Sequence, residues 1–274
     1  MNHFSKQDTK SLLQKYKTQP IKRFGQNFLI DKSAINKIIE VAEISPNDIV
    51  LEIGPGTGAL TQELAKRAKK VIAVEKDIKM IEILEETLKD FNNIEIIQGD
   101  ALKMADSQVI SPYKVVGNLP FYLTAPIIRQ FLETENPPKE MTLIVQKEVG
   151  QRICAKPPRM SILAVSVQIY AEPKIISYIS KKSFWPSPKV DSAIIKILKI
   201  NSNQEIDRDL FFKIVKAGFS QPRKQLINNL SKGMGMEKEK TEKWILKNKI
   251  EPSQRAETLS IDDWLKLLRD FLKN

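Results

Sequence analysis

The sequence predicts an α/β fold, in which helices cover both faces of a mostly parallel sheet, followed by a small all-helical domain. The first observation is that runs of β-branched residues alternate with stretches of helical periodicity between residues 32 and 145. The second is that only helical patterns follow the polar stretch at residues 201–204. Strands that alternate with helices at short intervals are typical of parallel sheets. We therefore predict two domains, residues 1–200 and residues 201–274.

Hydrophobic periodicity and turn residues define the elements of the first domain. Apolar residues recur at helical spacing from Lys32 to Ala42, and the turn Ser45-Pro46-Asn47-Asp48 separates them from a β-rich run. The elements predicted up to residue 145 are, in order, a helix at 32–42, a strand at 49–53, a helix at 59–68, a strand at 71–74, a helix at 78–88, strands at 94–97 and 113–116, a helix at 125–132 and a strand at 141–145.

The remaining elements are predicted in the same way. Residues 160–170 predict a buried helix, and residues 175–179 and 193–200 predict two further strands. Ser260 and Asp263 stand where an N-cap residue and its partner would begin the last helix. The helices predicted for the second domain are 210–217, 223–230, 239–246 and 261–272.

Composition excludes several classes of protein. The chain of 274 residues is long enough for a full core and a second, smaller domain. Its single cysteine, Cys154, and single histidine, His3, argue against a disulfide framework, a His-based triad and a Cys/His zinc site. We see neither a membrane span nor a secretory signal. We therefore expect a cytoplasmic protein without a metal.

The charge of the chain predicts a polyanionic partner. The net charge is +11 and the isoelectric point is near 9.5. Residues 1–30 form a basic arm with one acid, Asp8. The basic residues of this arm are Lys6, Lys10, Lys15, Lys17, Lys22 and Arg23. Basicity alone fits either nucleic acid or an anionic membrane, but the arm lacks a strongly amphipathic basic helix with a bulky apolar face.

A glycine loop, LEIGPGTGALT at residues 51–61, lies between a predicted strand and a predicted helix. Gly54, Gly56 and Gly58 allow a tight turn and a close approach of the backbone to a ligand. Glu75 ends the next strand, where a carboxylate can accept hydrogen bonds from ribose hydroxyls, and Asp100 follows the third strand. The loop also satisfies the relaxed dinucleotide pattern, so NAD stays open. Two acids favour S-adenosylmethionine, which carries a sulfonium and no pyrophosphate.

The tetrapeptide Asn118-Leu119-Pro120-Phe121 follows a predicted strand after the glycine loop, where doubly wound sheets place their reacting groups. The Asn118 side chain can present its oxygen to an exocyclic amine. Pro120 has no N–H to donate and stiffens the turn, which keeps neighbouring carbonyls aimed at the pocket. Phe121 can stack on a flat base. Taken alone, the tetrapeptide would be read as a turn with a core phenylalanine.

Four motifs in the same order resemble the ribosomal RNA small-subunit adenine N6,N6-dimethyltransferases. They are RFGQNFL at 23–29, EIGPGTG at 52–58, NLPF at 118–121 and FWPSPKVDS at 184–192. The stretch RAETLS at 255–260 is also similar, so the resemblance runs from about residue 20 to the end. It implies a Rossmann-like class I methyltransferase domain with a helical C-terminal domain. It also implies transfer of methyl groups from S-adenosylmethionine to two adjacent adenosines near the 3′ end of small-subunit rRNA.

The resemblance assigns roles to particular residues. Asn27 and Leu29 would cover the cofactor, Gly54 and Gly56 would lie against it, Glu75 would hold its ribose and Asp100 its adenine amine. Asn118 would lie between cofactor and target, its side-chain oxygen and the Leu119 carbonyl accepting hydrogen bonds from the amine. Phe121 and Phe184 would sandwich the target base. The candidates for RNA contact are Lys10, Lys22, Arg23, Lys189, Arg223 and Lys224.

The sequence departs from the family pattern at two positions. Phe121 stands where many relatives carry tyrosine, which keeps the stacking ring and loses a hydroxyl. Pro222 replaces a basic residue, which puts one RNA contact in question. The resemblance further implies a monomer that acts on rRNA or on an immature small ribosomal subunit.

Three other functions compete with this prediction. An NAD-dependent oxidoreductase would need a catalytic His or a Tyr-Lys pair, which we do not find. A non-catalytic ribosome assembly factor would not need the glycine loop, Glu75, Asp100 and the NLPF motif. A large-subunit rRNA methyltransferase of the macrolide-resistance type shares the glycine loop and a related N-x-P-aromatic motif, but the long match at both ends favours the small-subunit enzyme.

Overall fold

The computed structural model describes residues 5–104, 112–120, 123–199 and 206–273. The chain divides into two compact units. The first comprises Met1–Gly150 and Ala171–Lys199, and the second comprises Gln151–Tyr170 and Ile200–Asn274.

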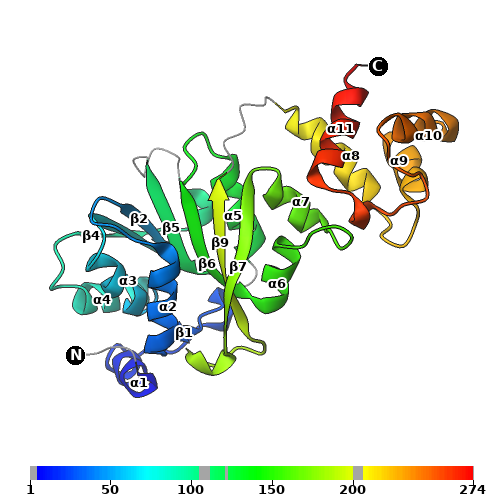
Figure 1. The fold of residues 1–274 in the computed structure, drawn as a ribbon. Coiled ribbons are helices and arrows are strands. Elements are labelled where there is room, and N and C mark those ends of the chain that lie inside the picture. The colour runs from blue at the N-terminus through cyan, green and yellow to red at the C-terminus, as the bar shows by residue number, and fades with distance from the viewer. Residues whose placement is uncertain (1–4, 105–111, 121–122, 200–205, 274) are drawn as a thin grey trace. The chain divides into compact units, whose positions relative to one another are not determined.

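The first unit is built on a seven-stranded, mostly parallel sheet (Figure 1). Its strands are β2 (Ile49–Ile53), β3 (Lys70–Glu75), β4 (Ile94–Gln98), β5 (Tyr113–Asn118), β6 (Glu140–Gln146), β7 (Ala171–Ile179) and β9 (Ser192–Lys199). Their spatial order is β4-β3-β2-β5-β6-β9-β7. The pairs from β4 to β6 are parallel, and β9 is antiparallel to both of its neighbours. The predicted α/β fold class is confirmed.

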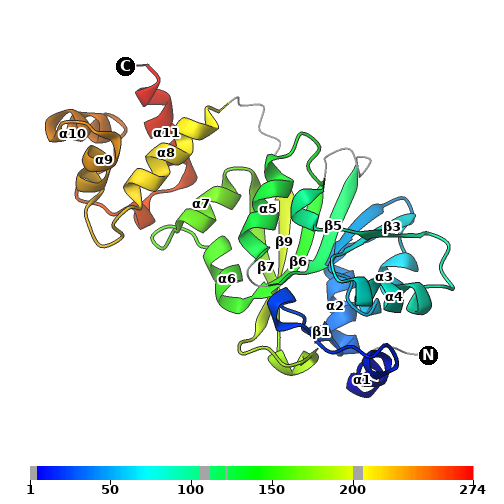
Figure 2. The same ribbon diagram turned by 180° about the vertical axis from the view of Figure 1, so that it is seen from behind.

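Helices cover both faces of this sheet. They include α2 (Lys32–Ala42), α3 (Ala59–Ala65), α4 (Ile78–Thr87) and α5 (Thr124–Glu133). Ile35 and Ile38 of α2 and Leu64 of α3 are fully buried in one cluster with Val50 and Ile194 of the strands. Helix α5 lies on the opposite face from α2, as the two views in Figures 1 and 2 show. On one side of β2 the sheet continues with β3 and β4, and on the other side with β5 and β6. A topological switch point therefore lies between β2 and β5.

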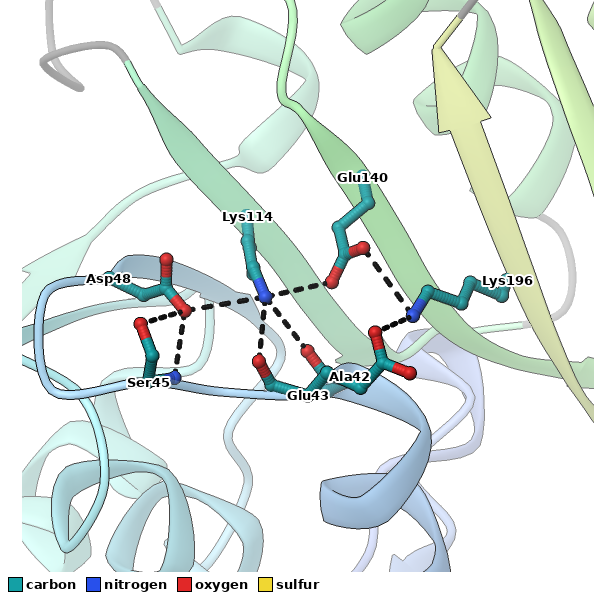
Figure 3. A network of polar contacts seen from close by, with 7 residues as sticks. All are labelled: Ala42, Glu43, Ser45, Asp48, Lys114, Glu140 and Lys196. Carbon is teal, nitrogen blue, oxygen red and sulfur yellow. Dashed lines mark hydrogen bonds and ion pairs between the residues drawn. The ribbon is translucent and has the colours of Figure 1, made fainter.

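A network of charged side chains lies at the amino-terminal edge of the sheet (Figure 3). The Lys114 ammonium on β5 lies 3.3 Å from an Asp48 carboxylate oxygen and 3.1 Å from Glu140 at the start of β6. It also donates to the carbonyls of Ala42 and Glu43 where α2 ends, at 3.2 and 2.8 Å. Lys196 of β9 joins Glu43 and Glu140 at 2.8 and 3.5 Å. The network therefore ties α2 to three neighbouring strands.

The basic arm is folded against the first unit. Helix α1 (Lys6–Lys15) buries Leu12 and Leu13 in a cluster with Met80 and Ile83 of α4. Its end is bound by Glu86, which accepts hydrogen bonds from Lys15 and Tyr16. These contacts fix the N-terminal arm to the helix that follows β3.

A two-stranded sheet connects the arm to the region before β9. Strand β1 (Phe28–Leu29) pairs antiparallel with β8 (Phe184–Trp185), with Leu29 opposite Phe184. The backbone N–H of Ile30 donates to the Ser183 carbonyl at 2.9 Å, and the Ser183 hydroxyl donates to Asp31 at 2.7 Å. Residues more than 150 positions apart are thereby held side by side.

The second unit is helical. Its helices are α7 (Ile162–Gln168), α8 (Arg208–Gly218), α9 (Leu226–Met234), α10 (Lys238–Lys247) and α11 (Ile261–Phe271), and α6 (Lys147–Ile153) ends in it. Trp264 is fully buried, and a Cβ on Gly218 would lie 2.4 Å from its ring. Close packing of α8 on α11 therefore requires glycine at this position. The predicted cap of α11 is present as a capping box between Ser260 and Asp263.

The structure corrects the predicted boundary between the domains. The prediction placed all of residues 1–200 in the first domain, but residues 151–170 belong to the second unit. Met160, Ala164 and Val165 are buried in the same apolar cluster as Phe211 and Trp264, and this packing explains the difference.

None of the helices in the described part of the chain is long and apolar enough to span a membrane.

Candidate active site

A pocket opens at the carboxyl ends of β2, β3 and β5, at the topological switch point of the sheet. Ligands of doubly wound folds bind at this place. The seven residues predicted to bind a cofactor all line the pocket; they are Asn27, Leu29, Gly54, Gly56, Glu75, Asp100 and Asn118. These residues are spread over 92 positions of the sequence (118 − 27 + 1), and the fold brings them to one pocket.

The glycine loop has a backbone that only glycine adopts readily. Gly54, Gly56 and Gly58 have φ angles of +69°, +58° and +86°, in the left-handed region. A Cβ on Gly56 would lie 3.1 Å from the Phe28 ring, so the basic arm packs directly on the loop. Gly58 precedes the first residue of α3.

Glu75 is held in one orientation by the backbone. Its Oε1 accepts hydrogen bonds from the N–H groups of Lys76 and Asp77 at 2.8 and 2.9 Å, and its Oε2 accepts one from Gly56 at 3.3 Å. Burial raises the pKa of the Glu75 carboxyl, and these hydrogen bonds oppose the shift. A carboxylate bound in this way keeps lone pairs for the hydroxyls of a ligand.

Asp100 faces a cation that sequence reasoning missed. The Lys76 ammonium lies 2.8 Å from Asp100 Oδ2, and the Leu102 N–H donates to Oδ1 at 3.1 Å. The hydrogen bond from Lys76 lowers the pKa of Asp100. Since Lys76 follows Glu75 directly, the sequence places it near the pocket. Only the side-chain geometry reveals the pair with Asp100.

Asn118 and Asn27 are joined across the pocket wall. The Asn118 amide nitrogen donates to the Asn27 carbonyl at 2.9 Å, and the Asn27 side chain donates to the Gly25 carbonyl at 3.0 Å. In the described part of the chain no group donates to Asn118 Oδ1. The amide is therefore oriented by its nitrogen and keeps its oxygen as an acceptor.

The rest of the NLPF motif is described only in part. Leu119 is buried and donates its N–H to the Ile144 carbonyl of β6 at 3.3 Å. Pro120 lines the pocket, and its carbonyl accepts a hydrogen bond from the Leu123 N–H at 2.9 Å. Phe121, predicted to stack on the target base, lies outside the described residues.

The position of Phe184 differs from its predicted one. Its side chain is 3% exposed and lies in the apolar cluster with Leu29, Ile179 and Ile194, and it does not line the pocket. Pairing of β8 with β1 turns this ring inward. The role of Phe184 against a target base stays a prediction; in this structure the ring packs in the apolar cluster.

The predicted RNA contacts are on the surface in both units. Lys22 and Arg23 are exposed in a single 3-10 turn that immediately precedes the pocket-lining residues 24–29, and Arg23 lies over the Phe24 ring. Lys10 is half-buried, 5.7 Å from the centre of the Trp185 ring. Lys189 is exposed in the loop after β8, and Arg223 and Lys224 are exposed in the segment before α9.

Sequence reasoning gave no role to two polar residues around the pocket. Gln26 donates to Asp77 Oδ2 at 2.8 Å and accepts from the Ile21 N–H at 2.8 Å, so it fastens the arm to the start of α4. Glu52 on β2 is almost completely buried and belongs to the lining of the pocket. Both lie within motifs that carry the family resemblance, and only their contacts show what they do. Among the described residues, no three His, Cys, Asp or Glu side chains are grouped to hold a metal ion.

The fold and the pocket are those of a Rossmann-like methyltransferase. The chain belongs to the ribosomal RNA adenine dimethylase family, whose model matches residues 18–273. It is 41% identical over 273 residues to the ribosomal RNA small subunit methyltransferase A of Dehalococcoides mccartyi strain CBDB1, with 97% of this chain and 93% of the relative covered. The family predicted from the sequence is confirmed, and with it the predicted class of enzyme, a ribosomal RNA adenine dimethyltransferase.

Two solved structures resemble the chain over most of its length. A dimethyladenosine transferase from Plasmodium falciparum superposes with a TM-score of 0.76 at 29% identity, and the match covers 89% of this chain and 96% of that one. The 23S rRNA methyltransferase ErmE gives a TM-score of 0.73 at 27% identity, covering 89% and 99%. The identity of the chain to ErmE is lower than its 41% identity to the small-subunit relative.

Proposed function

We propose that this protein transfers methyl groups from S-adenosylmethionine to N6 of two adjacent adenosines of 16S rRNA during assembly of the small ribosomal subunit in the cytoplasm. One observation carries the proposal: Gly54, Glu75, Asp100 and Asn118 line a single pocket at the switch point of the sheet. The family and its small-subunit relatives supply the class of substrate.

The residues around the pocket fit S-adenosylmethionine. Glu75, fixed by three backbone N–H groups, would accept hydrogen bonds from the ribose hydroxyls. Asp100 would accept from the adenine amine and exchange part of its contact with Lys76 for it. Gly54 and Gly56 allow close approach, while Asn27 and Leu29 cover the site from the arm. When bound, the cofactor supplies an electrophilic methyl group on a sulfonium.

The contribution of the protein to the reaction is mainly orientation and electrostatics. The lone pair of an adenine amine is delocalised into the ring, so the amine is a poor nucleophile. Asn118 Oδ1 and the Leu119 carbonyl would accept its two N–H groups and turn the lone pair toward the methyl carbon. No strong base is needed, because the methylated nitrogen is acidic enough to lose its proton to water. Among the described residues no histidine lines the pocket, which agrees with this mechanism.

The target base must leave its helix to enter the site. Unstacking costs about a few kcal/mol, which stacking on an aromatic ring offsets. We assign this role to Phe121. The phosphate contacts fall to Lys10, Lys22 and Arg23 beside the pocket and to Lys189, with Arg223 and Lys224 on the second unit.

The similarity to ErmE makes a large-subunit substrate the second candidate. The experiment uses methyl-tritiated S-adenosylmethionine with small ribosomal subunits from cells that lack the methylation, and with large subunits in parallel. Label recovered as N6,N6-dimethyladenosine from the small subunit is the expected result. Label in the large subunit alone would assign the protein to the resistance-type enzymes. Binding to small subunits without label would indicate an assembly factor.

A further inference from the structure

Tyr178 is an exposed aromatic residue on β7, the last strand of the sheet, and the proposed mechanism does not use it. It is 51% exposed, and Ile176 before it is 42% exposed. Edge strands usually carry charged residues, because exposed apolar side chains there invite unwanted pairing with other strands. The Lys147 ammonium lies 5.1 Å from the centre of the Tyr178 ring. An aromatic ring and a cation therefore lie together on an open surface.

A bulge in β7 turns the Tyr178 side chain toward helix α6. The register of β7 against β9 shifts by one residue between Ile175 and Ser177. Beyond this bulge Tyr178 lies opposite Ala193, on the face of the sheet that α6 covers. Without the extra residue Tyr178 would share the other face with Lys174. Bulges of this kind redirect side chains and are common beside active sites.

Tyr178 lies at the same edge of the sheet as the pocket. Strands β6 and β7 both run antiparallel to β9, so β7 ends at the edge where β5 and β6 end. Tyr178 is opposite Ala193, Ala193 is opposite Val145, and the residue before Val145 is opposite Asn118. Because neighbouring strands are about 4.8 Å apart, three steps separate the backbones of Tyr178 and Asn118 by about 14 Å. A stacked nucleic-acid strand covers this distance with about four nucleotides, at about 3.4 Å each.

The surface around Tyr178 is basic. The Lys147 N–H donates to the Asp191 carbonyl at 3.0 Å, and the Lys181 N–H donates to Asp191 Oδ1 at 2.9 Å. Asp191 therefore holds the start of α6 beside the turn that follows β7. Residues 147–148 and 178–191, which we call the Tyr178 surface, carry four exposed lysines and two exposed acids: Lys147, Lys181, Lys182 and Lys189, with Glu148 and Asp191.

We propose that Tyr178 stacks on an unpaired base of the rRNA beside the target adenosines, while Lys147, Lys181 and Lys182 contact its phosphates. The inference rests on the proposed function and deepens it, because it says how the strand is held while the target base occupies the pocket. Aromatic side chains stack on bases of any sequence, since every base has a flat face, and nearby lysines bind the backbone. Tyr178 does not line the cofactor pocket, so its effect should fall on the RNA.

Methylation kinetics with small ribosomal subunits test the contribution of the ring. Tyr178→Ala should raise the KM for the subunits roughly tenfold and leave kcat within about twofold of its original value. Tyr178→Phe keeps the ring and should behave as the unaltered protein. The affinity for S-adenosylhomocysteine, the product formed from the methyl donor, should be the same in all three proteins.

The salt dependence of KM tests the contact with phosphate. Lys147→Met should raise KM and lower the slope of log KM against log salt concentration by about 0.7, the value for one phosphate of a single strand. Lys174→Met is the matched control. This exposed lysine lies on the same strand as Tyr178 but on the opposite face, in a pair with Glu172. Its removal should leave both KM and the slope unchanged.

A crosslink identifies the group that the ring contacts. The photoreactive residue p-azidophenylalanine would be incorporated at position 178 and irradiated in the complex with small subunits. Primer extension would then locate the crosslinked nucleotide, which we expect within about four nucleotides of the target adenosines. The same residue incorporated at position 174 lies on the other face of the sheet and should not crosslink to this strand.

The outcomes separate the inference from the proposed function. A crosslink to a ribosomal protein would make that protein the partner of the surface and overturn the inference. A crosslink to distant rRNA, or none, would overturn it as well, as would an unchanged KM in Tyr178→Ala or an equal rise in Tyr178→Phe. All of these results leave the proposed function standing. Failure of the unaltered protein to methylate small subunits would instead contradict that function.

Discussion

The Asn118 side chain is a single group with two separate tasks. Its nitrogen is committed to the Asn27 carbonyl at 2.9 Å, and this bond sets the direction in which its oxygen points. Asn27 in turn is held by its own bond to Gly25. An acceptor fixed by neighbouring backbone does not need to reorganise when the target amine arrives, which is the condition for effective electrostatic catalysis.

Replacing Asn118 by alanine should therefore affect turnover more than cofactor binding. Loss of one oriented hydrogen-bonding group at a reacting centre lowers kcat by roughly 100-fold. We expect a change of this size in kcat and a change of less than about threefold in the affinity for S-adenosylhomocysteine. Methylation kinetics and calorimetry measure the two quantities. Equal loss in both would show that Asn118 serves the cofactor and not the amine.

Individual side chains also show which parts of the pocket the sequence could predict and which it could not. The backbone motifs predicted Gly54, Glu75, Asp100 and Asn118, because their roles follow from their places at strand ends. The pair of Lys76 with Asp100 and the inward turn of Phe184 depend on side-chain geometry and on a strand partner 155 residues away (184 − 29). Motifs and spacing in the sequence predict neither the Lys76–Asp100 pair nor the inward orientation of the Phe184 ring.

Among the elements, the basic arm at residues 1–30 contributes one wall of the pocket. Helix α1 is docked on α4, the segment 24–29 lines the pocket, and the Phe28 ring lies against the glycine loop. Gln26 joins this segment to Asp77, which caps α4 and is almost completely buried. The arm therefore forms one wall of the pocket, while Lys22 and Arg23 remain exposed.

Gln26→Ala should loosen this wall of the pocket. Its two hydrogen bonds, to Asp77 and from Ile21, are lost, at a cost of about 1 kcal/mol. We expect the affinity for S-adenosylhomocysteine to fall roughly fivefold, mainly through faster dissociation. Gln168→Ala is the control, because it removes two hydrogen bonds to backbone carbonyls in the second unit. Unchanged dissociation in Gln26→Ala would mean that the arm stays in place without this residue.

The charged network at the opposite edge of the sheet predicts an effect on stability. Lys114, Glu140 and Lys196 have side chains only 12–13% exposed, so removal of Lys114 leaves the partly buried Glu140 with only its longer contact to Lys196, at 3.5 Å. Lys114→Met should lower the free energy of unfolding by about 3 kcal/mol in urea. Lys37→Met breaks an exposed pair with Glu40 and should cost less than about 1 kcal/mol. Similar losses in the two variants would show that the network contributes nothing beyond surface charge.

The elements that sequence reasoning missed share a physical cause. Strands β1 and β8 have two residues each and exist only because they pair with each other. Helix α1 offers few apolar side chains and is stabilised by burial against α4. By contrast, β2, β3 and α11 carry long periodic patterns or clear caps, and the prediction found them. Short elements that depend on distant partners leave too weak a local signal.

At the scale of the whole molecule, the buried acids link stability to pH. The pKa of Glu52 is raised from 4.5 to about 8, so its favourable contribution is complete below pH 4.5 and is lost as the pH rises through 8. The pKa of Glu63 is lowered by Lys66 and Arg67 against the opposing effect of burial, so its contribution is present above pH 4.5 and is lost on acidification. The two acids on either side of the glycine loop thus act in opposite directions.

Glu52→Gln should therefore reduce the fall in Tm that accompanies a rise in pH. Without ligand, we expect the Tm of the unaltered protein to fall between pH 6 and 8.5, and that of the variant to fall less, so that the variant becomes the more stable at pH 8.5. Differential scanning calorimetry across this range makes the comparison. A parallel decline of both proteins would show that Glu52 does not titrate in this range.

The pairing of β1 with β8 also has a consequence for the way this protein is made. The arm leaves the translating ribosome early, but its strand partner follows only after most of the chain has been synthesised. Strand β9, which fills the gap between β6 and β7, emerges later still. A nascent chain thus has its glycine loop long before it has a closed cofactor pocket. The wall of the pocket that the arm forms can therefore be fixed only once residues up to 185 have been translated.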